Sequence, residues 1–397
     1  MRKTLTGLLF VSILMVGALA IAWATSPDPR GNPASFEDDP PQAIIAPLDR
    51  AVTLASYLTS DGARATLLVT SSEGDAVSGV DLVAIGGVRT GNPLRDLNSV
   101  EPSLLQPAAL DNLPKISVPI ADLLPAAPGG DRHIGTGTNF PEHAEEANSD
   151  SVFQFPKFGT ATPPRTTIRA QEGVLLDYEV ELCMRFDRNI ASLDDFDAAT
   201  KGVFLCSDFT NRNALVELAD PENLDSGFGF SDAKSGPGSY PSGPFVVVPN
   251  DWQSFVANAR MTTSVNGERR QDARGGEMTL DFRALTEKAL KDMDEARFYY
   301  QGSFYKLAEG QWISEDTTLM SGTAEGVIFT PPTRGDIIEG LASYIFAGGP
   351  LSDTGFLDTV KQRFIANELD SGQFLGPGDI VVHGSNYLGD IEVGVTE

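Results

Sequence analysis

The segment Asp177-Tyr178-Glu179-Val180-Glu181 places three acids within five residues. The surrounding run VLLDYEVELCMRF is rich in Val, Leu and Tyr, which predicts a strand, so Glu179 and Glu181 point to the same side. Two neighbouring carboxylates on a buried face require a cation, and Mg²⁺ and Ca²⁺ prefer such oxygens. The same alternation suits a solvent-facing antiparallel strand, so the pattern leaves both interpretations open.

A further acid, Asp208, ends the apolar run GVFLCSDF, and Arg212 follows it by four residues. An acid at the end of an apolar strand is placed to act as a third metal ligand. A turn residue or a helix cap would have the same position and the same residue type. The residues alone therefore do not choose between a ligand and a turn.

His143 lies in NFPEHAEEA, three residues before Glu146. In a helical turn the two side chains are neighbours, and a carboxylate beside an imidazole fixes its tautomer and raises its basicity. The pair could thus act as a general base, or it could be a chance pair on an exposed helical turn. His133 and His383 have no acidic neighbour of this kind, and we expect both to be structural.

Cys183 lies two residues after Glu181, and Cys206 lies two residues before Asp208. If Glu181 opposes Asp208 in an antiparallel pair, the two cysteines also face each other and could form a disulfide. The alternative, which we favour from the sequence, is two buried thiols that act as small apolar side chains.

Composition narrows the classes of protein. The chain has 397 residues, of which 41% are apolar and 21% charged, and a net charge of −26. That charge repels nucleic acid, so no nucleic-acid partner is expected. Two cysteines and three histidines exclude a disulfide-rich scaffold, a four-cysteine zinc site and most His-rich metal sites. A soluble acidic enzyme or binding protein, with an oxygen-ligated metal if any, remains.

Residues 1–24 resemble an export signal. Arg2 and Lys3 precede an uncharged stretch, and Ala22-Trp23-Ala24 has the small-x-small pattern of a cleavage site. Since about 20 residues can span a bilayer, the segment is predicted to be a signal peptide or an N-terminal anchor. Either way the folded part is expected in the periplasm or outside the cell, with membrane contact only through this segment if it stays uncleaved. Residues 25–42 are rich in Pro, Asp and Gly and read as a linker.

The remaining elements predict an α+β, β-rich protein. Residues 43–125 form a small N-terminal α/β domain, with a helix at Leu48–Leu58 and strands at 65–70 and 80–87. Residues 126–397 contain strand-like runs, a C-terminal strand pair and an amphipathic helix at 279–296 that Thr279 or Asp281 would cap. The apolar stripe of that helix is Phe282, Leu285, Ala289 and Met293. Two further helices, at 335–347 and 354–369, make an insertion at about 334–370.

The order of the motifs resembles the fumarylacetoacetate hydrolase (FAH) family. In chain order they are HIGTGTNFPEHAEEA, FQFPK, LLDYEVEL, LCSDFTNR, a lysine with PSGP, NGERRQ and MSGTAEGVIF, over roughly residues 120–330. The tail LGPGDIVVHGSNYLGDIEVGV resembles the closing strand pair of the family. The resemblance implies an FAH-type mixed β-roll catalytic domain over residues 126–397, a homodimer, and Mg²⁺ (or Ca²⁺ or Mn²⁺) as cofactor.

The resemblance also implies roles for single residues. Matched position by position, the metal ligands are Glu179, Glu181 and Asp208. The catalytic residues are the water-activating pair His143 and Glu146, together with Lys234. The substrate-binding residues are Lys157, Arg212 and Thr323. The chain departs from the family pattern at Phe140, Ser207 and Ala324, where Tyr, Asn and Pro are usual, and these departures leave the predicted ligands in place.

The activity that the resemblance implies is hydrolysis of a C–C bond in a 2-oxo or 1,3-dicarbonyl acid, such as an acylpyruvate or fumarylacetoacetate, through a metal-stabilised enolate. The partner is then a small oxo acid. The alternatives are a decarboxylase, hydratase or tautomerase of 2-oxo acids on the same fold, or an exported protein that binds oxo acids without turning them over.

Overall fold

The computed structural model describes residues 14–26, 32, 34–110, 112–351, 353 and 355–397. The chain divides into two compact units. One unit contains residues 33–327 and 375–397, and the other contains residues 1–32 and 328–374. The predicted N-terminal region 43–125 and the predicted site residues all lie in the first unit.

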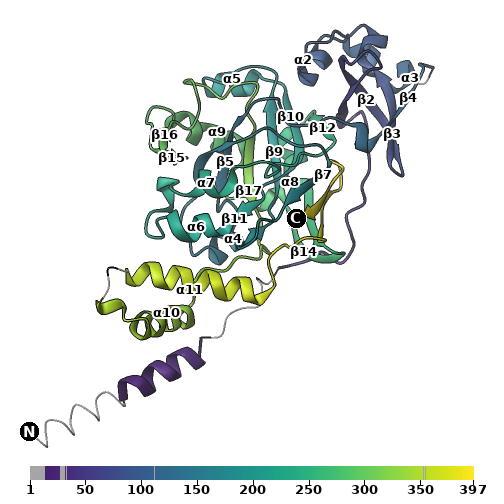
Figure 1. Cartoon of the computed structure of the whole chain (residues 1–397). Helices are drawn as coiled ribbons and strands as arrows, with labels where there is room; N and C mark the ends of the chain where they lie inside the picture. The colour runs from purple at the N-terminus through teal and green to yellow at the C-terminus, as the bar shows by residue number, and fades with distance from the viewer. Residues whose placement is uncertain (1–13, 27–31, 33, 111, 352, 354) are drawn as a thin grey trace, which may run out of the picture. The chain divides into compact units, whose positions relative to one another are not determined.

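A ten-stranded sheet organises the first unit (Figure 1). All of its pairings are antiparallel except the one between β17 and β5. The strands in sheet order are β4 (Ile116–Pro119), β3 (Ala76–Asp81), β2 (Arg64–Glu73), β1 (Ala51–Leu58), β12 (Phe245–Pro249), β10 (Lys201–Ser207), β9 (Val180–Phe186), β17 (Leu319–Thr323), β5 (Arg132–Gly137) and β6 (Phe153–Phe158). The predicted N-terminal strands therefore continue the sheet that carries β9 and β10.

A second sheet of five strands and two short strand pairs complete the β-structure. The five strands, in order, are β14 (Glu268–Arg274), β13 (Arg260–Val265), β18 (Ile380–Ser385), β19 (Asp390–Thr396) and β7 (Arg165–Arg169). The short pairs are β8 (Leu176–Asp177) with β11 (Thr210–Asn211), and β15 (Phe298–Tyr300) with β16 (Ser303–Tyr305). This α+β, sheet-rich architecture confirms the predicted fold class.

Short helices connect the strands. In chain order they are α2 (Pro93–Asn98), α3 (Pro107–Leu110), α4 (Pro141–Glu146), α5 (Leu193–Ala198), α6 (Arg212–Leu218), α7 (Phe230–Lys234), α8 (Trp252–Asn258) and α9 (Phe282–Lys291). The helix α9 confirms the amphipathic helix expected at 279–296, in a shorter form. The side chain of Asp281 accepts a hydrogen bond from the Ala284 amide and so caps it. The predicted stripe is buried.

Two predicted elements near the N-terminus are wrong. The expected helix at Leu48–Leu58 is the strand β1, because this segment pairs on one side with β12 and on the other with β2. Tertiary pairing thus overrides the local pattern. The strand expected at 80–87 ends at Asp81, whose side chain accepts a hydrogen bond from the Val83 amide and begins a 3₁₀ turn.

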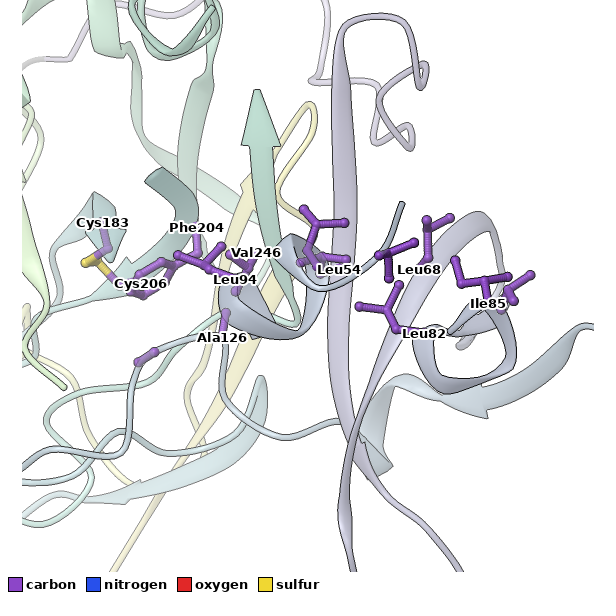
Figure 2. Packing of buried hydrophobic residues seen from close by; sticks show 14 of the residues in the cluster. Leu54, Leu68, Leu82, Ile85, Leu94, Ala126, Cys183, Phe204, Cys206 and Val246 are labelled. Atoms are coloured by element: carbon purple, nitrogen blue, oxygen red, sulfur yellow. A yellow bond between two sulfur atoms is a disulfide. The ribbon is translucent and has the colours of Figure 1, made fainter. Parts of the chain in front are cut away.

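The core next to β9 and β10 is apolar. A row of buried side chains extends from Phe204 and Val246 through Leu94 and Leu54 to Leu68 (Figure 2). At its inner end lies the disulfide between Cys183 and Cys206, whose Cα atoms are 6.0 Å apart.

The disulfide corrects two expectations. The two cysteines are bridged rather than free. The register is also shifted by two residues, because Glu181 opposes Cys206 and Cys183 opposes Phe204. Cys183 and Cys206 are therefore diagonal neighbours on one face of the sheet, within the Cα separation that a disulfide permits.

The second unit contains the predicted two-helix insertion. The helices are α10 (Arg334–Phe346) and α11 (Phe356–Ser371), which pack together as a hairpin (Figure 1). Residues 14–24 form a further helix of this unit, and the rest of the predicted signal or anchor segment lies outside the described residues. Of the helices in the described part of the chain, none is both long and apolar enough to cross a membrane.

The predicted linker has no helix or strand over its described residues. Its later part is tied to the five-stranded sheet: the Glu37 amide donates to the Asp272 carboxylate, and Arg274 forms an ion pair with Glu37. The residues between 34 and 42 therefore pack on the first unit instead of only connecting two domains.

Candidate metal centre and neighbouring dyad

Three carboxylates meet where β9 begins and β10 ends. Glu181 is the second residue of β9, Glu179 directly precedes that strand, and Asp208 directly follows β10. The Asp208 amide donates a hydrogen bond of 2.9 Å to the Glu179 carbonyl, which holds the two strand ends together. All three side chains are buried, and one oxygen of each lies within 4.8 Å of the others. The structure thus brings together the three predicted ligands.

Two lysines and an arginine neutralise two of these acids. Lys234 Nζ lies 2.6 Å from Glu179 Oε2 and 3.0 Å from Asp208 Oδ2. Lys157 Nζ donates to Asp208 Oδ1 at 2.6 Å. Arg212 Nη2 lies 2.8 Å from Glu179 Oε1. Burial opposes ionisation of Glu179, but Lys234, Arg212 and His143 lower its pKa to about 2.

Among the described residues no cation forms an ion pair with Glu181, although Lys234 acts on it from further away. Glu181 Oε2 accepts a hydrogen bond of 2.9 Å from the Gly322 amide. Its Oε1 is buried and has no hydrogen-bond partner among the described residues. Burial, with the nearby charges of Asp208 and Glu179, raises the pKa of Glu181 well above its usual value. A group in this state takes up either a proton or a metal ion.

The local charge balance also favours a cation. Counting Asp177, the site holds four buried acids, and the bases Lys157, Lys234 and Arg212 number three, so 3 − 4 leaves one negative charge when Glu181 is ionised. Each carboxylate oxygen has two lone pairs, so an oxygen that already accepts a hydrogen bond can still coordinate a metal. The donor set is wholly oxygen, which suits Mg²⁺, Mn²⁺ or Ca²⁺.

The bases reach the site from different elements. Lys157 comes from β6, Arg212 opens α6, and Lys234 ends α7. Burial lowers the pKa of Lys157, although Asp208 opposes that effect. For Lys234 the nearby Asp208 and Glu179 outweigh burial and raise the pKa. Lys157, Lys234 and Arg212 all bind carboxylate oxygens of the protein. Contact of Lys157 or Arg212 with substrate therefore stays a prediction.

The predicted dyad lies on α4. Pro141 occupies the first turn of this helix, where its missing N–H costs nothing. Two residues later, His143 Nδ1 lies 2.9 Å from Glu146 Oε2, and Glu146 Oε1 accepts from the Gly326 amide at 2.8 Å. A carboxylate can only accept here, so Nδ1 carries the proton and Nε2 keeps its lone pair. The Gly326 carbonyl accepts a hydrogen bond from the hydroxyl of Tyr178, the residue before Glu179, so Gly326 links the dyad to the segment that carries the carboxylates.

The predicted substrate residue Thr323 is the last residue of β17 and is buried. Its hydroxyl donates to the Val180 carbonyl and accepts from Gln271 Nε2, both at 2.9 Å. This links β9, β14 and β17 beside Glu181. The structure therefore places Thr323 where it supports the predicted ligand Glu181, and its contact with substrate stays a prediction.

The other two histidines are hydrogen-bonded inside the core. His383 lies between the hydroxyls of Ser207 and Thr263, each at 2.9 Å. The ring of His133 contacts the Gly159 carbonyl and accepts from the Thr318 amide. Burial lowers the pKa of both rings to about 3, so they are neutral at ordinary pH.

Some supporting residues had no predicted role. Asp177 pairs with Arg212 at 2.8 Å, and the Thr210 hydroxyl accepts from Lys234 at 2.9 Å. The Gly322 amide, which holds Glu181, depends on a positive φ of 80° that favours glycine. All three residues belong to the quoted motifs, which is a usable signal, but the role of Gly322 rests on its backbone amide and not on a side chain.

Comparisons with known proteins agree with this fold. The family model described as "Fumarylacetoacetate (FAA) hydrolase C-terminal" matches residues 132–396. An uncharacterised protein of Staphylococcus epidermidis is 30% identical over 177 residues, which is 43% of this chain and 56% of that protein. An uncharacterised Staphylococcus aureus protein is 30% identical over 184 residues, covering 45% of this chain and 58% of the relative. The chain thus spans a little over half the length of these curated relatives.

Two solved structures share the fold. A 2-hydroxyhepta-2,4-diene-1,7-dioate isomerase from Mycobacterium marinum has a TM-score of 0.51 and 16% identity, over 87% of this chain and 98% of the other. A putative HpcE protein from Mycobacterium smegmatis has a TM-score of 0.53 and 20% identity, over 87% of this chain and all of the other (100%). At such identities the likeness concerns the fold. With the family match across residues 132–396, the chain belongs to the fumarylacetoacetate hydrolase family.

Proposed function

We propose that the chain is a divalent-metal-dependent hydrolase that cleaves a C–C bond in 2-oxo or 1,3-dicarbonyl acids of the acylpyruvate or fumarylacetoacetate type. One observation carries most of the proposal. Glu181 Oε1 is buried without a hydrogen-bond partner among the described residues, beside two further carboxylates and near the His143–Glu146 dyad. A metal site next to a general base is the minimum that this reaction requires.

The three carboxylates would hold the ion. A divalent cation there would supply Lewis acidity toward the carboxylate and keto oxygens of a 2-oxo acid. Lys234 lies between Glu179 and Asp208, so it would share these two ligands with the ion. Glu181 would then no longer need its proton, which is how the site couples metal binding to its ionisation.

His143 would move the proton. Glu146 holds Nδ1, so the free Nε2 takes a proton from water. The resulting hydroxide adds to the distal carbonyl carbon of the substrate. The bond between the two carbonyl-bearing fragments then breaks, and its electron pair leaves with the 2-oxo acid fragment as an enolate. Protonated His143 returns a proton to that enolate carbon, so the products are a carboxylic acid and a 2-oxo acid.

The test is turnover of acetylpyruvate by the full chain, with and without EDTA. We expect EDTA to abolish turnover and added Mg²⁺ or Mn²⁺ to restore it. We expect His143→Ala to lower kcat by about 10²–10⁴-fold, the contribution of a general base. The matched control is Glu142→Gln on the same helix, since Glu142 is exposed. Full activity of His143→Ala would remove the dyad from the mechanism.

Product analysis separates the alternatives. Isomerised, hydrated or decarboxylated products would replace hydrolysis by a tautomerase, hydratase or decarboxylase that uses the same enolate. Tight binding without any product would assign a binding role. We also propose a homodimer, which light scattering of the purified chain would test by its mass.

A further inference from the structure

The helical insertion forms one compact unit with the N-terminal helix. Trp23 Nε1 donates to Glu339 Oε1 on α10 at 2.8 Å, and the Gly335 amide donates to the Ser26 hydroxyl at 3.2 Å. The other oxygen of Glu339 accepts from Asn367 on α11, also at 2.8 Å. One carboxylate therefore joins three helices, and the segment around Trp23 is built into the hairpin.

The tip of this hairpin is apolar and exposed. The tip, defined as residues 345–351 and 355–357, contains no charged residue, and the sequence 343–352 carries no charge. Within the tip, Phe346 is 90% exposed, Leu351 95% and Leu357 68%. Large apolar side chains that gather on one surface mark a site of interaction with lipid or protein.

The occupant that the unit itself indicates is lipid. Its N-terminal helix also exposes apolar side chains, namely Leu14, Met15, Val16 and Ile21. The sequence is uncharged from Thr4 to Pro27, and Trp23 lies near the end of that run, where aromatic residues meet a bilayer interface. The net charge of −26 favours neutral over anionic headgroups.

We propose that the α10–α11 tip inserts its apolar side chains into the interface of a neutral bilayer, with the N-terminal segment kept uncleaved beside it. The unit would then act as a membrane foot that holds the first unit at the lipid surface. Interfacial binding of this kind scales with the buried apolar area, and the tip side chains are those that gain most from burial.

The test measures depth in the membrane on the full chain. Both native cysteines are in the disulfide, so a cysteine introduced by Leu351→Cys is the only thiol that a nitroxide reagent can label. In phosphatidylcholine vesicles we expect the label to gain collisions with oxygen, which concentrates in lipid, and to lose collisions with a water-soluble nickel chelate. The matched control is Ser371→Cys, an exposed site at the opposite end of α11.

Two outcomes would overturn the proposal. In one, vesicles change the nickel accessibility of the Leu351 and Ser371 labels equally. In the other, the Leu351 label shows spin–spin broadening between two copies without added oxygen contact, which would assign the tip to a dimer interface. The readout is independent of turnover, so it stands apart from the proposed hydrolase activity. As a second variant, Phe346→Ser with Leu357→Ser should make the Leu351 label shallower without changing the circular dichroism spectrum.

Discussion

Strands β9 and β10 contain two kinds of buried interior a few residues apart. At one end Glu179, Glu181 and Asp208 lie within 4.8 Å of one another and are surrounded by cations. Two residues further along the same face, Cys183 and Cys206 join the strands covalently among apolar side chains (Figure 2). The carboxylate cluster is destabilised by repulsion between its buried acids. The apolar region is stabilised by packing and by the disulfide. We infer that the disulfide-linked part of β9 and β10 holds together strand ends whose carboxylates would otherwise repel each other.

The largest expected effect is in the carboxylate cluster of Glu179, Glu181 and Asp208. Glu181→Gln keeps the size of the side chain and removes the charge that a metal would use. We expect the affinity for Mn²⁺ to fall by at least about 100-fold, because losing a residue that only supports a metal ligand already costs up to about that much. Turnover should fall with it. Titration calorimetry of the wild type and the variant measures the affinity.

The same variant should not destabilise the metal-free protein. The pKa of Glu181 is raised, so its ionised form is less favourable in the fold than in the unfolded chain. In EDTA at neutral pH the variant should therefore unfold at the same or a higher temperature than the wild type. A loss of both metal affinity and metal-free stability would instead make Glu181 a structural residue.

The next effect concerns the apolar layer. The disulfide closes a loop with a sequence separation of 23 residues, and removing it should cost about 3 kcal/mol of unfolding free energy. The double variant Cys183→Ala with Cys206→Ala tests this by urea denaturation. We expect turnover at 25 °C to survive, because the hydrogen bond between Asp208 and Glu179 still joins the strand ends. An unchanged unfolding free energy would show that the bridge contributes nothing to holding the strands.

A smaller effect should follow from the group that orients the base. Glu146→Gln keeps a hydrogen-bond acceptor near His143 but loses the charge. We expect kcat to fall by about 10–100-fold, as for other outer partners of a functional group, while metal affinity is unchanged. Glu142→Gln is again the control. A change in Mn²⁺ affinity in Glu146→Gln would mean that the dyad and the carboxylates are not separable.

The sequence predicted the carboxylate cluster better than it predicted the strand pairing around the disulfide. The motifs around Glu179, Glu181 and Asp208 predicted a carboxylate cluster through their resemblance to the family, and the structure brings these side chains together. Strand register is not visible in the residue types. A shift of two residues keeps every side chain on the same face of the sheet. Cys206 therefore opposes Glu181, and not Cys183 as predicted, without any change in the alternating pattern.

The same limit explains the strand β1. Its local composition allowed a helix, and pairing with β2 and with β12, which is distant in sequence, decides for a strand. In contrast, α9 was predictable because its period and its cap at Asp281 are local. Backbone donors such as the Gly322 amide stayed hidden for a different reason, since every residue has an amide and the geometry alone gives this one a role.

The effect that is smallest at neutral pH is on the opposite face of β10, where His383 contacts Ser207. Its pKa in the fold is about 3, against 6.5 for the free side chain. Between these values the unfolded chain binds a proton that the folded chain does not, so stability falls as the pH falls from about 6.5 toward 3, with a slope of at most about 1.4 kcal/mol per pH unit. His383→Gln should have a shallower slope over this range in urea denaturation. Parallel slopes would show that His383 can be protonated while the protein stays folded. The interior around His383 and Ser207 would then be less rigid than we infer for the disulfide-linked strands β9 and β10.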